Sequence, residues 1–397
     1  MISNRQLFLQ HVATTSDYPI SLEIERAEGI YMYTPEGKKY LDLVSGVSVS
    51  NLGHGHPRVR QAVKDQVDKY MHLMVYGEFI ETPQVRLAKL LVDNLPAKLD
   101  SVYFVNSGSE ANEGAIKLAK RYTGRSEIIH FNNAYHGSTH GALSVLGDEE
   151  MKNAYRPLLP DVRQIEFDNI DDLKKITNQT ACVILEPIQS EAGFIIPSKE
   201  FLVGLRKRCD ETGALLIFDE VQMGFGRTGK LFAFEHFDVI PDILTLAKAM
   251  GAGMPIGAFI SEKGILDSFK SNPMLGHITT FGGHPVSCAA ALAGLEVLLD
   301  EKIIEDVDRK GELFVSLLED HPLIKGFRKK GLFIAVNVEN QDVMLEIMKQ
   351  AYELGIVMDP FLFYPGAFRI APPLVITDDE IRESCQLLIK AMDAVKI

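Results

Sequence analysis

The sequence predicts an α/β fold in which a large domain with a mostly parallel sheet is accompanied by a smaller α+β domain. Three observations support this prediction. Between about residues 100 and 260, short apolar runs alternate with helical patterns. Beyond residue 285, longer helical patterns alternate with only a few strand-like runs. The chain has 397 residues, which exceeds the length that a single hydrophobic core favours.

The strands of the large domain are expected where apolar residues are continuous, because parallel strands are buried on both faces. The runs are Val102–Val105, Ile128–Phe131, Ala181–Leu185 and Ala214–Phe218. Apolar residues at helical spacing in Ala111–Tyr122, and a second helix through Phe201, Leu202 and Leu205, provide crossovers between these strands. This alternation predicts helices on both faces of the sheet.

The smaller domain is expected from both ends of the chain. A helical pattern covers Pro285–Leu299, and strand-like runs follow at Gly331–Val338 and Phe368–Ile370. Tyr31–Asp42 reads as a hairpin that precedes the large domain. We therefore expect residues 1–50 to join the small domain, residues 51–285 to form the large domain and residues 286–397 to complete the small one.

Composition narrows the class of protein. Lys and Arg total 41 against 54 Asp and Glu, a formal net charge of −13, which argues against nucleic acid or an anionic membrane as the main partner. The four cysteines are far apart and form no C-x-x-C pair, and the opening residues lack the apolar stretch of a signal peptide. A cytoplasmic protein is the expectation.

Three loops at the carboxyl ends of expected strands carry candidate chemistry, since α/β proteins bind ligands there. The first, Asn106–Glu110, is a small turn at a helix N-terminus, where backbone N–H groups attract an anion. Ser107 and Ser109 would add hydroxyl donors. The alternative is an ordinary helix cap with Glu110 behind it.

The other two loops carry charged side chains after buried strands. Asp219 and Glu220 follow an apolar run, and a buried carboxylate needs a cationic or proton-donating partner. Lys248 follows the run Ile243–Ala247, and removal from water lowers the pKa of a lysine and makes its amine a nucleophile. Asp219 as a turn cap and Lys248 as a lysine reaching solvent are the alternatives. The three loops together suit one cofactor with a phosphate, a basic ring nitrogen and an aldehyde.

The motifs around these loops resemble the class III aminotransferases of fold type I, the pyridoxal-phosphate enzymes that include ornithine, acetylornithine and 4-aminobutyrate aminotransferases. The resemblance covers nearly the whole chain, in the order of the family. The matching stretches are GHGHP from Gly53, NSGSEANE from Asn106, AYHG from Ala134, EPIQSEAG from Glu186, FDEVQMGFGRTG from Phe218, LAKAMG from Leu246, TTFGGHP from Thr279 and RIAPPL from Arg369.

The resemblance implies a role for individual residues toward pyridoxal 5′-phosphate. Lys248 would form the Schiff base and move a proton, while Asp219 would keep the pyridine nitrogen protonated. Gln222 would lie near the ring hydroxyl. Tyr135 would stack on the ring, with His136 beside it.

The phosphate would be held by two chains. Gly108 and Ser109 would bind it, joined by Thr280 of a neighbouring subunit. That assignment implies at least a homodimer with active sites at the interface between subunits.

The resemblance also identifies candidate substrate residues. Arg369 would bind the α-carboxylate of glutamate or 2-oxoglutarate, and Glu191 would neutralise it when the other substrate is bound. A structural ion pair between domains is the alternative. Ser138 stands where several relatives carry an arginine that binds a carboxylate of the donor. Val47 stands where ornithine-specific relatives carry a tyrosine, so the donor is expected to be an amine or an ω-amino acid, with acetylornithine or ornithine still open.

Three alternatives complete the expectations. His54, His56 and His284 suggest a metal site, but no carboxylate cluster is near them in the sequence, so we expect no metal. An aminomutase or racemase of the same fold is the nearest alternative enzyme, although related aminomutases lack the glutamate found here as Glu191. A catalytically silent cofactor-binding protein is the alternative of another class.

Overall fold

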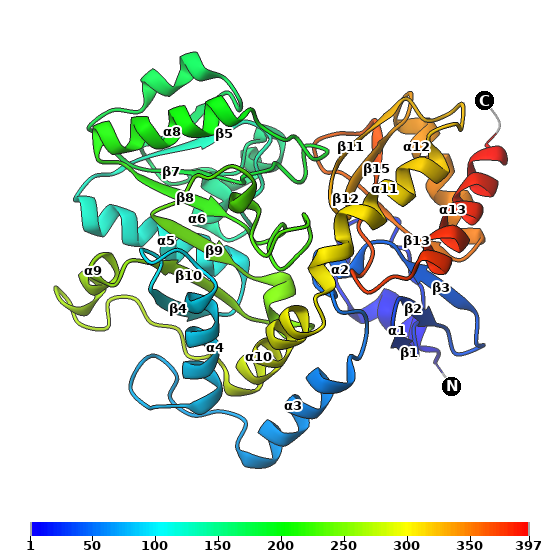
Figure 1. Cartoon of the computed structure of the whole chain (residues 1–397), viewed down its shortest axis with the longest axis horizontal. Helices are drawn as coiled ribbons and strands as arrows, with labels where there is room; N and C mark the ends of the chain where they lie inside the picture. The colour runs from blue at the N-terminus through cyan, green and yellow to red at the C-terminus, as the bar shows by residue number, and fades with distance from the viewer. Residues whose placement is uncertain (1, 396–397) are drawn as a thin grey trace.

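The computed structural model describes residues 2–395. Within these residues the chain forms a large sheet of seven strands and two sheets of four strands, and Figure 1 shows the large sheet on one side of the molecule and the small sheets on the other. The strands of the large sheet, in spatial order, are β4 (Ser101–Val105), β10 (Gly257–Ser261), β9 (Ile243–Leu246), β8 (Leu215–Asp219), β7 (Thr180–Leu185), β5 (Glu127–Phe131) and β6 (Val162–Ile165).

The large sheet is mostly parallel, as the sequence predicts. Strands β9, β8, β7, β5 and β6 pair in parallel with one another, whereas β10 runs antiparallel to both β4 and β9. Because β10 is reversed, β4 points in the same direction as β8 and β9. The loops that follow β4, β5, β8 and β9 therefore meet at one edge of the sheet.

Successive residues of each strand enter two different cores, because side chains alternate across a sheet. In β8, Leu215 and Ile217 pack with helix α5 (Gly108–Thr123) on one face. Leu216 and Phe218 pack with helix α8 (Lys199–Thr212) on the other face. Both faces are apolar, which explains why the strands read as continuous hydrophobic runs.

The remaining sheets combine the two ends of the chain. One contains β1 (Arg26–Glu28), β2 (Tyr31–Tyr33), β3 (Lys39–Asp42) and β13 (Ile356–Val357), and the other contains β11 (Gly326–Lys330), β12 (Phe333–Asn337), β15 (Ala367–Ile370) and β14 (Asp359–Pro360). The expected hairpin is present as β2 and β3, and β3 pairs in parallel with β13. The N-terminal strands thus lie beside C-terminal elements (Figure 1).

Helices complete both halves of the molecule. The longer ones are α3 (Pro57–Lys69), α4 (Thr82–Asp93), α10 (Pro285–Asp300), α11 (Val307–Leu318), α12 (Gln341–Glu353) and α13 (Asp378–Asp393), and the short helices include α1 (Asn4–His11), α2 (Ser45–Ser48), α6 (His140–Ser144), α7 (Glu149–Lys152) and α9 (Lys263–Leu266). The four cysteines are free and buried. Between residues 2 and 395, no helix combines the length and the apolar character needed to cross a membrane.

A buried arginine joins distant parts of the chain. Arg227 follows β8 and is fully buried; its Nη1 donates to the carbonyls of Leu332 (3.1 Å) and Pro372 (2.6 Å), and its Nη2 donates to Asn51 Oδ1 (2.5 Å). These acceptors are neutral, and burial lowers the pKa of Arg227 to about 9. The guanidinium therefore links the large sheet to N-terminal and C-terminal segments through its fixed fork of donors.

Replacing Arg227 with Met should lower the free energy of unfolding by about 2–5 kcal/mol, because buried oxygens lose their donors. Urea unfolding of the variant measures this change. Arg309→Met is the control, since Arg309 makes exposed ion pairs with Asp306 and Asp378, whose loss should change the free energy of unfolding much less. Equal stability of the Arg227 variant and the native protein would contradict the assignment.

Candidate active site

A cavity of about 470 Å³ opens at the edge of the sheet where the loops after β4, β5, β8 and β9 meet. The structure brings most of the sequence-predicted cofactor residues together in its wall. These residues are Ser107, Gly108, Ser109, Tyr135, His136, Asp219, Gln222 and Lys248. They come from segments up to about 140 residues apart in the chain (107 to 248), so the cavity is a product of the fold.

The first wall of the cavity is the N-terminus of α5. Ser107 caps the helix by accepting a hydrogen bond from Glu110 N (3.2 Å), and Glu110 Oε2 accepts from Asn106 N (2.7 Å). The ordinary helix cap considered as an alternative is therefore present. Capping does not exclude anion binding, because the first-turn N–H groups of a helix have no intrahelical acceptor. A Cβ at Gly108 would come within 2.7 Å of Val221, so close packing favours glycine there.

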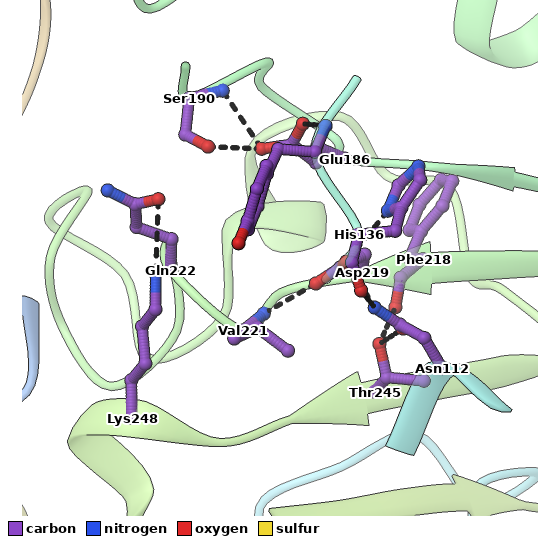
Figure 2. A network of polar contacts seen from close by, with 11 residues as sticks. Asn112, His136, Glu186, Ser190, Phe218, Asp219, Val221, Gln222, Thr245 and Lys248 are labelled. Carbon is purple, nitrogen blue, oxygen red and sulfur yellow. Dashed lines mark hydrogen bonds and ion pairs between the residues drawn. The ribbon is translucent and has the colours of Figure 1, made fainter. Parts of the chain in front are cut away.

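Asp219 is a cavity carboxylate with hydrogen-bond partners on both oxygens (Figure 2). Its Oδ2 lies 2.8 Å from His136 Nδ1 and accepts a hydrogen bond from Asn112 Nδ2 at 2.7 Å. Its Oδ1 accepts from Val221 N at 2.9 Å. Asp219 and His136 were predicted from the sequence. Asn112 was not, because only the packing of α5 against the sheet brings it to the carboxylate.

The neighbouring carboxylate, Glu220, belongs to the protein framework. It is fully buried, and its two oxygens accept hydrogen bonds from the backbone N–H groups of Ala233 (2.5 Å) and Phe234 (2.7 Å). Burial raises the pKa of Glu220 to about 8, and the two hydrogen bonds oppose that rise. The two adjacent acids therefore differ: Asp219 lines the cavity and Glu220 caps the turn at Ala233.

Lys248 lies at the end of β9 and reaches into the cavity. Its Nζ donates to Gln222 Oε1 at 3.3 Å (Figure 2), and desolvation lowers the pKa of the amine, an effect that nearby Glu191 opposes. Its backbone φ is +49°, in the left-handed region that residues other than glycine rarely adopt. Such strain is concentrated at functional sites.

Glu186 connects two loops beside the cavity. Its Oε1 accepts from Tyr135 N at 3.1 Å, and its Oε2 accepts from Ser190 N at 3.0 Å (Figure 2). Burial raises the pKa of this carboxyl to about 7, while His136 lowers it. Its partners are two backbone N–H groups and the hydroxyl of Ser190, four residues later. The role of Glu186 was not predicted from the sequence, because backbone partners leave no side-chain pattern.

The predicted pair Glu191 and Arg369 is formed. Both are buried, and Arg369 Nη2 donates to Glu191 Oε1 (2.8 Å) and Oε2 (2.7 Å). A second carboxylate, missed in the sequence, is Asp359, whose Oδ1 lies 3.5 Å from Arg369 Nε. Burial raises the pKa of Asp359 to about 6, and Arg369 opposes the rise. Neither Glu191 nor Arg369 is among the residues that line the cavity itself.

Three further predicted residues, like Glu191 and Arg369, lie outside the cavity wall of this chain. Ser138 is exposed, and its Oγ lies 3.1 Å from the hydroxyl of Tyr135. Thr280 is exposed, which fits its expected role toward a neighbouring subunit but does not test it. Val47 is 37% exposed, whereas Val49, two residues later, lines the cavity.

The histidines considered as metal ligands have other partners. His54 Nε2 lies 2.9 Å from Asp42 Oδ2, and His284 Nδ1 accepts from Val286 N at the start of α10. Among residues 2–395 no group of three or more His, Cys, Asp or Glu side chains is placed to hold a metal ion.

Comparison with known proteins gives the family. The model of the class-III aminotransferases matches residues 12–392. The chain belongs to this family. The resemblance seen in the sequence is thereby confirmed, and the protein is an enzyme, as predicted, rather than a catalytically silent binding protein.

Individual relatives agree in sequence and in fold. Acetylornithine aminotransferases of Methanopyrus kandleri and Methanocaldococcus jannaschii are each 39% identical to this chain; the alignments cover 97% of this chain and 97% of the first relative, and 93% and 92% for the second. An ornithine aminotransferase structure from Toxoplasma gondii, with pyridoxal phosphate at partial occupancy in its active site, superposes with a TM-score of 0.90 at 31% identity, covering 98% of this chain and 93% of that chain. A Bacillus anthracis aminotransferase superposes with a TM-score of 0.90 at 28% identity, covering 98% of both. These matches confirm fold type I.

The segment before the cavity has an unusual backbone. Ser45, Gly46, Val47 and Ser48 have φ values of 54°, 57°, 61° and 61°, so α2 is a left-handed turn. The turn is held by Asp42 Oδ1, which accepts from Ser45 N at 2.8 Å, and by Ser45 Oγ, which donates to Ala371 O at 2.6 Å. This turn was not predicted from the sequence, because valine disfavours a left-handed backbone.

Because the backbone at Val47 is left-handed, we predict that a glycine variant is more stable there than an alanine variant, the reverse of the order within a right-handed helix. Val47→Gly should be more stable than Val47→Ala by about 1 kcal/mol, because glycine adopts positive φ freely. Val203 is the control, an exposed valine within the right-handed helix α8, where Ala should be more stable than Gly by about 1 kcal/mol. Thermal unfolding of the four variants measures both orders, and the same order at both positions would contradict the left-handed turn.

Proposed function

We propose that the protein is a pyridoxal-phosphate-dependent aminotransferase that moves an amino group from an amine or ω-amino acid to 2-oxoglutarate. The observation that carries the proposal is the meeting, in one cavity, of a desolvated lysine amine, a buried carboxylate and a helix N-terminus. Acetylornithine and ornithine are the donors suggested by the names of the relatives.

The residues of the cavity fit the cofactor. Gln222 Nε2 is buried and has no hydrogen-bond partner among residues 2–395, as expected for a donor that awaits a ligand oxygen. The α5 N-terminus, with Gly108 and Ser109, offers donors for a phosphate. When bound, pyridoxal phosphate would supply an aldehyde that condenses with amines and a ring that accepts electrons.

The side chains then have distinct tasks. Lys248 provides the amine that reacts with an aldehyde, and its lowered pKa increases the fraction of neutral, nucleophilic Nζ. The same Nζ, which reaches into the cavity, would also take and return a proton. Asp219 would accept a hydrogen bond from a protonated ring nitrogen, and His136 and Asn112 hold its carboxylate in place.

Arg369 is the proposed site for the α-carboxylate of the acceptor. A planar guanidinium suits bidentate carboxylate binding, and Glu191 occupies it in the structure. Exchange of Glu191 for a substrate carboxylate would let one pocket accept both an amine-type donor and 2-oxoglutarate. Ser138 offers no charge for the far end of the donor, so that end is expected to be held by other groups.

The cellular location, the oligomeric state and the domain division of the enzyme are also part of the proposal. The enzyme would be a cytoplasmic homodimer in which Thr280 of one subunit helps to bind the phosphate in the other. Residues 51–285 would form the cofactor-binding domain. Residues 1–50 and 286–397 would form the small domain, a division supported by the pairing of β3 with β13.

Lys248→Ala should reduce transamination by at least about 10²–10⁴-fold, because both the amine and the proton-transferring group are lost. The measurement is glutamate formed from 2-oxoglutarate with acetylornithine, ornithine, 4-aminobutyrate, lysine or a diamine as donor. Lys230→Ala, at an exposed lysine of the loop after β8, should keep full activity. Native turnover by the Lys248 variant would refute its role, and conversion of a donor without glutamate formation would favour an aminomutase.

Arg369→Lys should raise the KM for 2-oxoglutarate by about 10–100-fold, because a lysine keeps the charge but loses the bidentate fork worth about 1.5–3 kcal/mol. The half-reaction with the amino donor, followed by stopped-flow absorbance, should change much less. An unchanged KM for 2-oxoglutarate would exclude Arg369 as the carboxylate site and leave the pair with Glu191 as a structural contact between domains.

A further inference from the structure

Asn112 is a buried polar residue whose hydrogen bonds extend beyond the carboxylate of Asp219. It lies in the second turn of α5, just beyond the residues proposed to bind phosphate, and it is 1% exposed. Its Nδ2 donates to Asp219 Oδ2 (2.7 Å) and to the carbonyl of His136 (2.8 Å). One amide therefore joins α5 to the carboxylate at the end of β8 and to the loop after β5.

The orientation of this amide is fixed by a third contact. Thr245 in β9 donates from Oγ1 to Asn112 Oδ1 at 2.7 Å (Figure 2), and the threonine is fully buried. Rotation of the amide by 180° would place Oδ1 against Asp219 Oδ2 and the carbonyl of His136, both of which are acceptors. Only one orientation of the amide therefore allows both its NH2 group and its oxygen to form hydrogen bonds.

The position of the amide matters for the carboxylate. Asp219 Oδ2 accepts from Asn112 and faces His136 Nδ1, while Oδ1 accepts from Val221 N. A carboxylate with donors on both oxygens cannot turn about its Cβ–Cγ bond without losing hydrogen bonds at a buried site, where an unmade bond is costly. Asn112 approaches from the α5 side, so it fixes the carboxylate relative to the proposed phosphate site.

We propose that Asn112, oriented by Thr245, is a positioning residue that sets the direction in which Asp219 meets the ring nitrogen of the cofactor. The inference rests on the proposed function of Asp219. It predicts that Asn112 and Thr245 act through one another, because the hydroxyl of Thr245 donates to Asn112 Oδ1 at 2.7 Å, whereas its contact with the carbonyl of Phe218, next to Asp219, is much longer at 3.5 Å. A merely structural link between α5 and β9 would not require that dependence.

The test uses the holoenzyme and follows loss of its visible cofactor absorbance after dilution into excess phosphate buffer. Asn112→Ala should release the cofactor about 10–100-fold faster, in line with the loss of a hydrogen bond to a charged group. Thr245→Val, which keeps the shape and removes the hydroxyl, should release it about 3–10-fold faster. In the double variant the change at Thr245 should add little, because the hydrogen bond from Thr245 to the Asn112 amide is already gone.

Asn112→Asp provides a pH-dependent readout. The carboxyl group that this substitution introduces can still donate to Asp219 while it is protonated, whereas two ionised carboxylates at this distance repel each other. Cofactor release from this variant should therefore accelerate as the pH rises from 6 to 9, a dependence that Asn112→Ala, which has no group to titrate there, should lack. Asn132→Ala is the matched control, an asparagine whose Oδ1 accepts from Phe167 N away from Asp219, and it should release the cofactor at the native rate.

The outcomes separate this inference from the proposed function. If the native protein holds no cofactor, the proposed function itself fails. If the native protein holds it but the Asn112 variants release it at the native rate, the positioning role is overturned. If Thr245→Val accelerates cofactor release by the same factor in the native protein and in Asn112→Ala, the proposed action of Thr245 through Asn112 is overturned. It is also overturned if cofactor release accelerates only in proportion to a lower melting temperature and does so equally in Asn132→Ala.

Discussion

The arrangement of the cavity depends on a carboxylate that the fold buries at the end of a central strand. Asp219 is only 3% exposed, and a charge in such a place must be matched by hydrogen-bond donors. The donors come from α5, from the loop after β5 and from the turn after β8. Satisfying this one group therefore fixes three separate segments around the space next to Lys248, so the wall of the cavity is largely formed before any ligand enters.

Two buried arginines link the halves of the molecule, and the chemistry of their partners gives them different capacities. Arg227 donates to backbone carbonyls and an asparagine oxygen. An anionic ligand could take the place of these acceptors only if the chain around them unfolded. Arg369 is held by the side chain of Glu191, and a substrate carboxylate presents the same two oxygens. Arg227 is thus suited to a permanent joint, while Arg369 is suited to an exchange of partners.

The sequence predicted the large sheet well, because strands covered on both faces leave an unbroken apolar signal, as in Leu215–Phe218. It did not predict the reversed strand β10, since an apolar run such as Gly257–Ser261 carries no information on direction. Residues that line the cavity were found through motifs that carry chemistry. Asn112 was not, because its role arises only when α5 packs across β8 and β9. The positive φ of Val47 was not predicted either, because valine disfavours that conformation. The contacts of Ser45 with Asp42 and Ala371 hold the turn in place despite this preference.

Asp359 makes the proposed exchange at Arg369 physically reasonable. Removing the sole partner of a buried charge typically costs about 3–5 kcal/mol, so a guanidinium paired only with Glu191 would oppose the departure of that glutamate. In this chain Asp359 is the cross-strand neighbour of Arg369 and lies 3.5 Å from its Nε, a different nitrogen from the Nη2 that donates to Glu191. When Glu191 leaves, Arg369 would still have a counter-charge, and Nη2 would be free for an incoming carboxylate. In the proposed exchange, the second carboxylate would thus reduce the free-energy cost of separating Glu191 from Arg369, and it would do so without occupying the Nη2 donor.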